Sequence, residues 1–486
     1  MSFDLVLFGG TGDLAWRKLM PALFQAFRHG TLPAEGRITG VARDDMSHEQ
    51  YRTLIQSRFN SVEGAKRPSD EEFQRFAALL HYVRLDASKA EDFQRLRNHL
   101  EERNADTVVM YVATAPGLFT TVCEQLATAG LNTPKTRIVL EKPLGHDLAS
   151  NRAINQTVRK AFNENQIFRI DHYLGKPSVQ NLFALRFGNA LFEPMWRREH
   201  IANIQITISE DLGVEKRGAF YENTGALRDM VQNHALQLLC AVGMEPPINA
   251  HADAIRDEKL KVLRSLKPWT SETLTHHVVR GQYSAGAVGG TAVPGYRAEF
   301  GVDPQSHTET FVALRTEIAN WRWAGVPFYI RTGKRLAGRD AHIEVNFRPM
   351  PHAIFANTGN TANRLVINLQ PKDGLELHLM AEGQGTRSGS AGQTLVPVQL
   401  DLDFDKRFGA ERVGAYERLL LDVLDGRLNL FVRSDEQEAA WRWVEPILNH
   451  WKNDTVGPRL YAAGTWGPSA SSAMIARDGF CWSEEC

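Results

Sequence analysis

Four side chains that can bind an anion or move a proton lie within six consecutive positions of the chain. They are Asp171, His172, Tyr173 and Lys176, in a stretch (168–176) that starts like a β-strand and contains a glycine near its end. Convergence of proton-handling and anion-binding groups at a domain junction predicts a catalytic or binding site. The alternative is a strand end with solvated charges, and this stretch alone does not decide between the two.

Length and composition bound the possible functions. A chain of 486 residues is too long to fold around one hydrophobic core, so two or three domains are expected. A hydrophobic fraction of 43% and a charged fraction of 23% are typical of a soluble globular protein. The chain has 56 Lys and Arg residues and 57 Asp and Glu residues, which gives a formal charge of −1. The protein therefore has no overall positive charge that would attract nucleic acid or an anionic membrane. Any anion site must therefore be a local cluster.

Cysteine usage and the N-terminal sequence indicate the compartment. The four cysteines (Cys123, Cys240, Cys481 and Cys486) form no CxxC pair, which argues against a zinc site or a disulfide scaffold. The chain enters an apolar segment (3–8) without a basic region before it, so we expect no signal peptide, and no apolar run is long enough to span a bilayer. These features predict a cytoplasmic protein without a metal cofactor.

A glycine-rich turn follows the first predicted strand (5–8) and precedes a helix-like segment (16–27). Its sequence GGTGDLA places Gly10-x-Gly12-x-x-Ala15 in the dinucleotide-binding pattern, in which glycines let the backbone approach a pyrophosphate at a helix N-terminus. Similar turns also occur without a ligand, but the position after the first strand favours a cofactor. The predicted contacts of this turn are Gly9, Gly10, Gly12, Asp13 and Leu14.

The end of the second predicted strand (37–42) bears on the choice of cofactor. Arg43 stands where an NAD enzyme usually keeps an acid for the ribose hydroxyl, and an arginine suits the 2′-phosphate of NADP. Asp44 and Asp45 follow directly and could weaken that charge or bind a free ribose themselves. We therefore predict NADP as the preferred cofactor and leave NAD open.

Strands and helices alternate through the rest of the first third of the chain. Predicted strands at 80–85, 107–113, 137–140 and 166–170 are separated by helical segments, which indicates a doubly wound parallel sheet of the Rossmann type. Asp86 ends one of these strands, and Lys142, followed by a proline, ends another. Ligands bind at the carboxyl edge of such sheets, so we assign both residues to the cofactor site, although most lysines lie on the surface.

Beyond residue 176 the pattern changes to alternating apolar and polar residues. Strands of this kind, with no regular crossover helices, predict a mostly antiparallel sheet, at 201–209, 310–317, 342–347, 364–370, 375–379 and 396–404. Helices are expected to cover this sheet at 224–242, 416–424 and 436–448. The predicted architecture is thus α/β plus α+β, with a nucleotide-binding domain at 1–172 and a substrate-binding and oligomerisation domain at 173–486.

His234 lies within the apolar stripe of the helix predicted at 227–238. One interpretation is a buried core histidine with a hydrogen-bond partner. The other is a general base, which needs a carboxylate to orient it. Asp229 lies about 140° away on the helix at about 100° per residue, so it cannot orient the ring, and Asp171 is the best candidate.

Taken together, these segments resemble the glucose-6-phosphate dehydrogenase family. The motifs that carry the resemblance are GGTGDLAWRKL (9–19), EKP (141–143), RIDHYLGK (169–176), RDMVQNHALQ (228–237) and VPFYIRTGK (326–334). Further matching segments lie at 416–426, 430–443 and 463–469, so the resemblance covers nearly the whole chain.

The resemblance implies oxidation of β-D-glucose 6-phosphate at C1 to 6-phospho-D-glucono-1,5-lactone, with hydride transfer to NADP, the first oxidative step of the pentose phosphate pathway. It implies His234 as the general base and Asp171 as its partner. Lys142 would lie between nicotinamide and substrate, and Arg43 would bind the 2′-phosphate. The substrate-binding residues implied are His172, Tyr173, Lys176 and Lys334 for the phosphate, and Glu210 and Asp229 for the sugar hydroxyls.

The chain also departs from the family pattern. The family often has a second lysine five positions after the one matched by Lys334, and here that position is Arg339, which we include in the substrate site. The resemblance supports a homodimer or homotetramer, formed through the antiparallel sheet, but not the extra NADP site of animal enzymes. Another NAD(P)-dependent sugar or sugar-phosphate dehydrogenase is the nearest alternative. A catalytically silent NADP-binding regulator is disfavoured because His234 and Asp171 are both present.

Overall fold

The chain forms two compact units, each assembled from separate segments. The computed structural model describes residues 2–33, 35–60, 67–352, 363–382, 395–409, 413–454 and 456–485. The first unit comprises Met1–Gly175, Ile248–Arg256 and Val413–Glu438, and the second comprises Lys176–Pro247, Asp257–Arg412 and Ala439–Cys486. The predicted division at a single point between residues 172 and 173 differs from this arrangement, because the chain returns twice to the first unit.

The first unit contains a seven-stranded sheet in the order β17-β6-β5-β4-β1-β2-β3. Its strands are β1 (Ser2–Phe8), β2 (Glu35–Ala42), β3 (Leu80–Arg84), β4 (Thr107–Val112), β5 (Thr136–Leu140), β6 (Ile167–Ile170) and β17 (Phe431–Val432). Strands β1 to β6 pair in parallel, and only β17 runs antiparallel to its neighbour. All residues of β4 are buried, as expected for a strand covered on both faces. The predicted doubly wound parallel sheet is confirmed.

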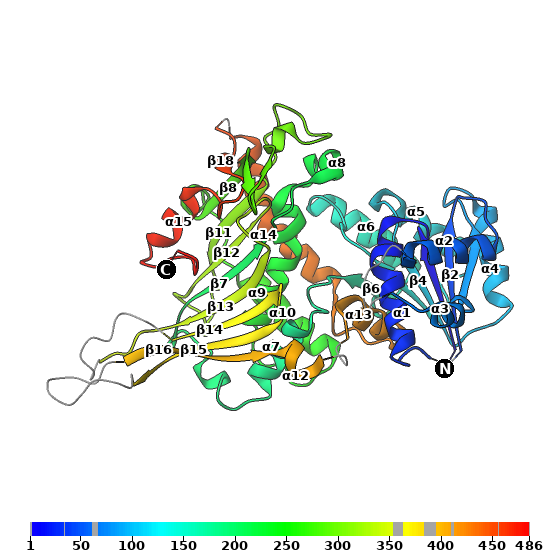
Figure 1. Cartoon of the computed structure of the whole chain (residues 1–486), viewed down its shortest axis with the longest axis horizontal. Helices are drawn as coiled ribbons and strands as arrows, with labels where there is room; N and C mark the ends of the chain where they lie inside the picture. The colour runs from blue at the N-terminus through cyan, green and yellow to red at the C-terminus, as the bar shows by residue number, and fades with distance from the viewer. Residues whose placement is uncertain are drawn as a thin grey trace. The chain divides into compact units, whose positions relative to one another are not determined.

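Helices flank this sheet (Figure 1). They are α1 (Met20–Arg28), which continues the π-helical turn η1 (Ala15–Leu19), then α2 (His48–Asn60), α3 (Asp70–Ala77), α4 (Ala90–Glu101), α5 (Phe119–Thr128), α6 (Leu148–Ala161) and α13 (Ala415–Asp425). The predicted N-cap of α6 is confirmed, since the Asp147 carboxylate accepts a hydrogen bond from the Ser150 amide at 2.7 Å.

The position of α13 corrects one prediction. This helix belongs to the first unit, where it contacts α1 and β4, so the expectation that residues 416–424 cover the antiparallel sheet is wrong. Glu417 of α13 pairs with His29 at 2.7 Å, and Arg137 donates a hydrogen bond to the Val423 carbonyl at 2.6 Å. An amphipathic pattern predicts that a helix has a buried face but not which sheet it packs against.

The second unit contains a nine-stranded sheet in the order β16-β15-β14-β13-β7-β12-β11-β8-β18. Its strands are β7 (Ile201–Ser209), β8 (Val278–Ser284), β11 (Phe311–Glu317), β12 (Pro327–Gly333), β13 (Asp340–Phe347), β14 (Arg364–Gln370), β15 (Gly374–Glu382), β16 (Leu395–Asp403) and β18 (Arg459–Ala462), with a separate hairpin of β9 (Gly286–Val288) and β10 (Thr291–Val293). Strand β12 is parallel to β7 and β18 is parallel to β8, while all other pairs are antiparallel. The predicted mostly antiparallel sheet is confirmed.

Helix α7 (Pro177–Phe187) contacts helix α9 (Leu236–Gly243) and strand β14 of this sheet. The π-helix η7 (Leu227–Ala235) contacts strand β12. The polar residues of β7 are buried as well. One of them, Gln205, donates a hydrogen bond to the Cys481 carbonyl at 3.0 Å. The remaining helices are α8 (Gly218–Glu222), α11 (Ser271–His277), α12 (Phe404–Phe408) and α15 (Ser469–Ala476), with α10 (Ala252–Ser265) and α14 (Ser434–Lys452), whose first residues belong to the first unit.

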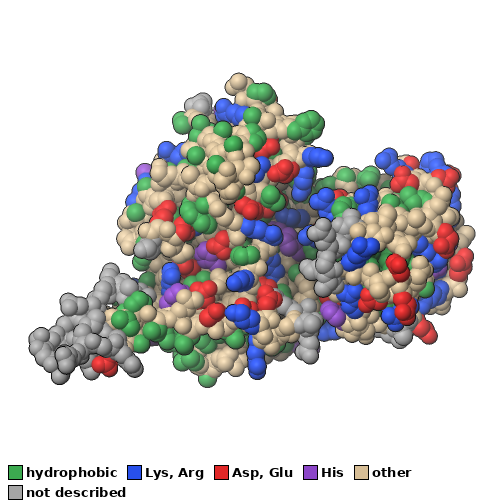
Figure 2. Space-filling model, viewed as in Figure 1, with side chains coloured by type: hydrophobic (Ala, Val, Ile, Leu, Met, Phe, Trp, Pro, Cys, Tyr) green, Lys and Arg blue, Asp and Glu red, His purple; other side chains and the backbone are tan. Residues whose placement is uncertain are grey.

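The described part of the chain also shows the state of its cysteines and the character of its helices and surface. Cys123 and Cys240 are buried free thiols, whereas Cys481 is disulfide-bonded. In the described ranges no helix is long and apolar enough to cross a membrane, and no group of three or more His, Cys, Asp or Glu side chains is arranged to hold a metal ion. On the face shown in Figure 2, Lys and Arg side chains are interspersed with Asp and Glu side chains, in agreement with the nearly neutral composition.

Three histidines cluster at the β3 edge of the first sheet. The ring of His81 lies 5.1 Å from that of His48 and 5.8 Å from that of His99. His48 Nδ1 accepts a hydrogen bond from the Tyr82 amide at 2.9 Å, so that nitrogen carries no proton. Burial, aided by nearby positive charge from Arg37, lowers the pKa of both His81 and His99 to about 4. The folded unit therefore binds protons at lower pH than the unfolded chain does.

We expect the free energy of unfolding to fall between about pH 6.5 and pH 4, because unfolded histidines titrate near 6.5 and take up protons first. Replacing His81 by Gln should flatten this dependence, measured by urea unfolding at several pH values. The matched control is the exposed His251 changed to Gln, which should retain the wild-type slope. An unchanged slope in the His81 variant would contradict the assignment.

Candidate active site

The glycine turn after β1 packs directly against β2. The amides of Gly9 and Gly10 both donate to the Val41 carbonyl, at 2.9 and 3.1 Å, and the Gly12 amide donates to the Gly9 carbonyl at 2.8 Å. Gly9 has a φ of +81°, and a Cβ atom at Gly10 would lie only 2.6 Å from the Cα of Gly40. Larger residues would therefore separate the turn from the strand.

The same turn leads into a helix start that suits an anion. Gly12 is followed directly by the helix, which begins at Asp13 and Leu14 and takes π-helical form from Ala15. Asp13 is exposed and pairs with Arg17 at 2.7 Å, so its charge is already partly compensated. Close backbone approach and amides at a helix start fit the pyrophosphate of a dinucleotide. The five residues predicted from the fingerprint thus lie in one short segment that runs from the turn into the first residues of the helix.

Groups that could contact the adenosine ribose lie at the ends of β2 and β3. Arg43 is exposed, and the Thr11 hydroxyl donates to the Asp44 carboxylate at 3.3 Å, so this acid is directed towards the glycine turn. Hydrogen bonds from Ser88 lower the pKa of the half-buried Asp86 carboxyl, and the positive charge of Arg43 contributes to the same shift. Arg43 and Asp86 therefore belong to one edge of the sheet.

A buried carboxyl group marks the end of β5. Tyr111 donates a hydrogen bond of 2.6 Å to Glu141, which is 8% exposed. Burial raises the pKa of Glu141, the hydrogen bond from Tyr111 opposes this, and the negative charge of Asp171 adds to the rise. Lys142, the next residue, acts on the same carboxyl with its positive charge. The structure thus brings Lys142 and Asp171 to neighbouring strand ends.

The motif after β6 is held by local contacts. Asp171 accepts a hydrogen bond from the Tyr173 amide at 3.0 Å, and Arg169, which is fully buried, pairs with Glu164 at 2.6 Å. The division between the two units falls inside the motif, between Gly175 and Lys176. Residues 171–173 therefore belong to the cofactor unit, and Lys176 begins the second unit.

Sequence reasoning missed one residue of this part of the site. The ring of His172 stacks on Tyr416 of α13 with centroids 5.9 Å apart and an interplanar angle of 14°. The pKa of Tyr416 is raised by burial and by the charges of Glu141 and Asp171. The only sequence signal for Tyr416 was its position at the start of a matching segment (416–426), which does not identify a contact.

The second unit contributes a separate group of charged residues. Lys334 follows β12 and Glu210 follows β7, and their side chains form an ion pair at 2.5 Å. His234 is buried on η7, and Asp229 is half-buried on the same helix. The remaining predicted residues lie elsewhere in this unit: Lys176 is buried and donates to the Leu369 carbonyl at 3.5 Å, whereas Arg339 is exposed between β12 and β13.

Glu309 holds the start of the helix that carries His234, and the sequence did not point to it. The Leu227 amide donates to its carboxylate at 3.0 Å, and the Ala226 amide donates to its carbonyl at 3.0 Å. Burial raises the pKa of Glu309, and the hydrogen bond from Leu227 opposes that rise. A buried acceptor at a helix N-terminus satisfies amides that have no partner within the helix.

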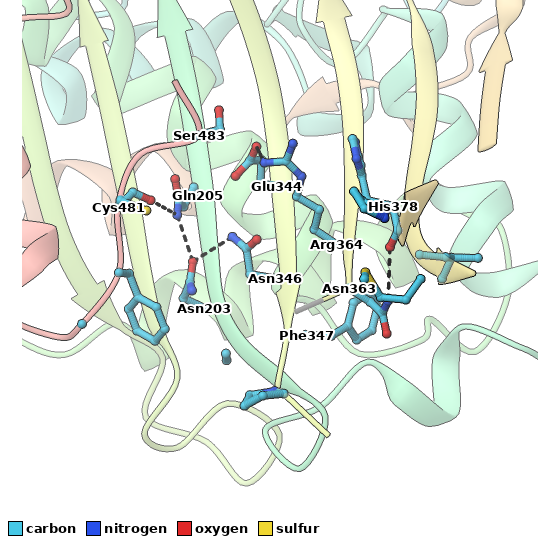
Figure 3. A pocket seen from close by; sticks show the side chains of 17 residues that line it. Asn203, Gln205, Glu344, Asn346, Phe347, Asn363, Arg364, His378, Cys481 and Ser483 are labelled. Atoms are coloured by element: carbon cyan, nitrogen blue, oxygen red, sulfur yellow. Dashed lines mark hydrogen bonds and ion pairs between the residues drawn. The ribbon is translucent and has the colours of Figure 1, made fainter. Parts of the chain in front are cut away.

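A pocket of about 670 Å³ opens on the sheet of the second unit (Figure 3). Polar side chains of β7, β13 and the C-terminal segment surround it, including Asn203, Gln205 and Glu344. Asn203 accepts hydrogen bonds from Gln205 and Asn346 at 3.2 and 3.0 Å. None of the predicted catalytic, substrate-binding or cofactor-binding residues lines this pocket.

The first unit has a glycine turn on a parallel sheet, and the second unit has a group of charged residues on a sheet of its own. These two features are typical of one class of proteins, the nicotinamide-dinucleotide oxidoreductases. Two family models match: "Glucose-6-phosphate dehydrogenase, NAD binding domain" over residues 6–181 and "Glucose-6-phosphate dehydrogenase, C-terminal domain" over residues 183–483. The chain belongs to the glucose-6-phosphate dehydrogenase family.

Individual relatives match over the full length. Glucose-6-phosphate 1-dehydrogenase of Rhizobium meliloti (strain 1021) is 49% identical over 486 residues, covering 99% of this chain and 98% of the relative. The enzyme of Mycolicibacterium smegmatis is 47% identical, covering 99% and 97%. A solved glucose-6-phosphate dehydrogenase in complex with its substrate glucose-6-phosphate has a TM-score of 0.90 at 32% identity, covering 99% and 98%. The structure from Mycobacterium avium has a TM-score of 0.84 at 36% identity, covering 99% of both chains.

Proposed function

We propose that the protein oxidises β-D-glucose 6-phosphate at C1 to 6-phospho-D-glucono-1,5-lactone and transfers the hydride to NADP, in the first oxidative step of the pentose phosphate pathway. The observation that carries this proposal is the full-length match to a structure that holds glucose 6-phosphate. The reaction needs a base and alignment but no protein nucleophile. It takes place in the cytoplasm.

His234 is the general base, and Asp171 orients it. The imidazole removes the proton from the C1 hydroxyl, which allows the hydride to leave C1 as the carbonyl forms. The carboxylate of Asp171 selects the imidazole tautomer and stabilises the imidazolium. When bound, the nicotinamide would supply the hydride acceptor, and Lys142 would lie between it and the substrate. The burial of His234 supports this role, because a base shielded from water retains its position and tautomer.

The substrate is held mainly through its phosphate. A phosphate dianion is best bound by several charge-assisted donors, and in a chain of formal charge −1 they must be local. Glu210 and Asp229 accept hydrogen bonds from the sugar hydroxyls. The donors to the phosphate are His172, Tyr173, Lys176, Lys334 and Arg339.

NADP is bound by the first unit. The turn of Gly9, Gly10, Gly12, Asp13 and Leu14 receives the pyrophosphate, and Arg43 binds the adenosine 2′-phosphate. Asp86 lies at the same edge and contacts the adenosine part of the cofactor. The hydrogen bond between Thr11 and Asp44 supports this choice, because it occupies the acid that would otherwise bind the ribose of NAD. NADP is thus the preferred cofactor in this proposal, and NAD is left open as a second one.

The protein assembles as a homodimer or homotetramer through the antiparallel sheet of the second unit. Four apolar side chains on one face of edge strand β16 are exposed: Val396, Val398, Leu400 and Leu402. Leu400, at 59%, is the most exposed of the four. A continuous apolar row on an edge strand marks an association surface, since monomeric proteins normally protect such edges.

Replacing His234 by Asn should lower kcat by about 10²- to 10⁴-fold, because the variant cannot take the C1 hydroxyl proton. The KM for glucose 6-phosphate should stay close to the wild-type value, because the base acts in the transition state. Reduction of NADP, followed spectrophotometrically, measures both.

The substrate itself is tested with the wild-type enzyme, for which glucose serves as the control substrate. Equal rates with glucose and glucose 6-phosphate would rule out the proposed substrate.

Replacing Arg43 by Ala should reduce kcat/KM for NADP about tenfold or more and leave that for NAD nearly unchanged, since only NADP loses a charge-assisted contact. Initial rates with each cofactor provide the measurement. Arg84, which is exposed and pairs with Asp45 at 3.6 Å, provides the matched control when changed to Ala. Equal losses with the two cofactors would be incompatible with the role of Arg43.

Replacing Leu400 by Lys should raise the dissociation constant of the oligomer at least about tenfold, because a charge replaces a central apolar contact. Analytical ultracentrifugation over a range of concentrations measures it. The matched control is Leu191 changed to Lys, because Leu191 is also exposed, at 64%, and lies outside the sheet. If both variants associate like the wild type, the β16 row is not the interface.

A further inference from the structure

Lys334 is fixed through its backbone as well as its side chain. Its amide donates to the Thr310 carbonyl at 2.9 Å, and its carbonyl accepts a hydrogen bond from the Tyr461 hydroxyl at 2.7 Å. Its ammonium group pairs with Glu210 at 2.5 Å. The backbone hydrogen bonds fix the position of the Cα atom of Lys334, and the ion pair fixes the position of its ammonium group.

A second partner of this ammonium group is an aromatic ring. The Nζ atom of Lys334 lies 5.1 Å from the ring centroid of Tyr221 on α8, a residue that is 4% exposed. A cation within about 6 Å of a ring centroid is attracted by the ring quadrupole, more strongly where water is excluded. The ring of Tyr221 is therefore placed to hold Lys334 independently of Glu210.

Tyr221 itself is held by other aromatic residues. Its ring meets that of Tyr296 edge to face, with centroids 6.1 Å apart and an angle of 71°. Tyr296 is fixed in turn by a hydrogen bond from its hydroxyl to Glu222 at 2.5 Å and by an edge contact of 5.6 Å with Tyr283. The ring beneath Lys334 therefore belongs to a packed cluster and cannot turn away freely.

The phenol of Tyr221 is kept neutral first by its burial and then by the negative charges around it. Burial raises the pKa of Tyr221 well above its ordinary value, and the carboxylates of Asp229, Glu309 and Glu210 add to this effect. Two of these, Asp229 and Glu210, are proposed to bind the sugar hydroxyls. Tyr221 thus lies among the substrate-binding residues of the second unit, although neither its position nor its residue type marked it in the sequence.

We propose that Tyr221 is a positioning residue that holds the Lys334 ammonium against its ring face and thereby sets the affinity for the sugar phosphate. The inference rests on the proposed role of Lys334 in binding the substrate phosphate. A lysine side chain has several rotatable bonds, and ordering it before the ligand arrives reduces the entropic cost of binding. When Glu210 turns to a sugar hydroxyl, the ring still holds the ammonium, since a cation–π contact needs no proton acceptor.

Replacing Tyr221 by Leu should raise the KM for glucose 6-phosphate about five- to tenfold and change kcat less than about twofold, because the variant loses the cation–π contact with Lys334 while its leucine still fills part of the space beside Tyr296. Tyr221 changed to Phe keeps the ring face and should remain close to wild type. Steady-state kinetics with saturating NADP provides both values. A raised KM in the Phe variant equal to that in the Leu variant would overturn the proposal.

A matched control separates this role from general packing. Tyr283 belongs to the same cluster and is 1% exposed, and Tyr283 changed to Leu removes a comparable buried ring that does not lie over Lys334. The proposal expects its KM to stay within about twofold of wild type, in contrast to Tyr221→Leu. Equal increases in KM in the two variants would show that damage to the cluster, rather than loss of the ring under Lys334, is responsible.

A double-mutant cycle with Lys334→Met tests whether Tyr221 acts through Lys334. If it does, Tyr221→Leu adds nothing to the KM of Lys334→Met, whereas independent effects would multiply and overturn the inference. The cycle also distinguishes the two proposals. A raised KM in Lys334→Met with a wild-type KM in Tyr221→Leu overturns the inference alone. A wild-type KM in Lys334→Met overturns the proposed role of Lys334 and the inference with it.

Discussion

Parallel strand pairing is the constraint on which the charged groups of each unit depend. In the first unit, β4, β5 and β6 run side by side, with Val112 opposite Leu140 and Leu140 opposite Arg169. The residues that follow these strands must therefore emerge at one edge of the sheet. This pairing brings Lys142 and Asp171 together although they are separated by a whole helix in the sequence.

The second unit uses the same constraint within a sheet that is otherwise mostly antiparallel. Strand β12 runs parallel to β7, with Gly333 opposite Ser209, so Lys334 and Glu210 leave their strands at the same edge and form an ion pair. Antiparallel pairing would have sent these residues to opposite ends of the sheet. The parallel pairing thus places this ion pair against the ring of Tyr221.

In each unit, a buried carboxyl group accepts a hydrogen bond from a donor on a neighbouring element. Glu141 accepts from the Tyr111 hydroxyl, and Glu309 accepts from the Leu227 amide at the start of η7. Burial raises the pKa of each, and the hydrogen bonds offset part of that cost. Such groups maintain the geometry of Lys142 and of the His234 helix.

The sequence by itself determined the two kinds of sheet, the glycine turn and the chemistry-bearing motifs, because these depend on periodicity and spacing over a few residues. It also named His234 without deciding between core and site. Only the tertiary structure decided that α13 joins the first unit, that Tyr416 stacks on His172, and that Tyr221 lies against Lys334. These contacts join residues more than a hundred positions apart, and no local pattern specifies which distant surface a buried side chain meets.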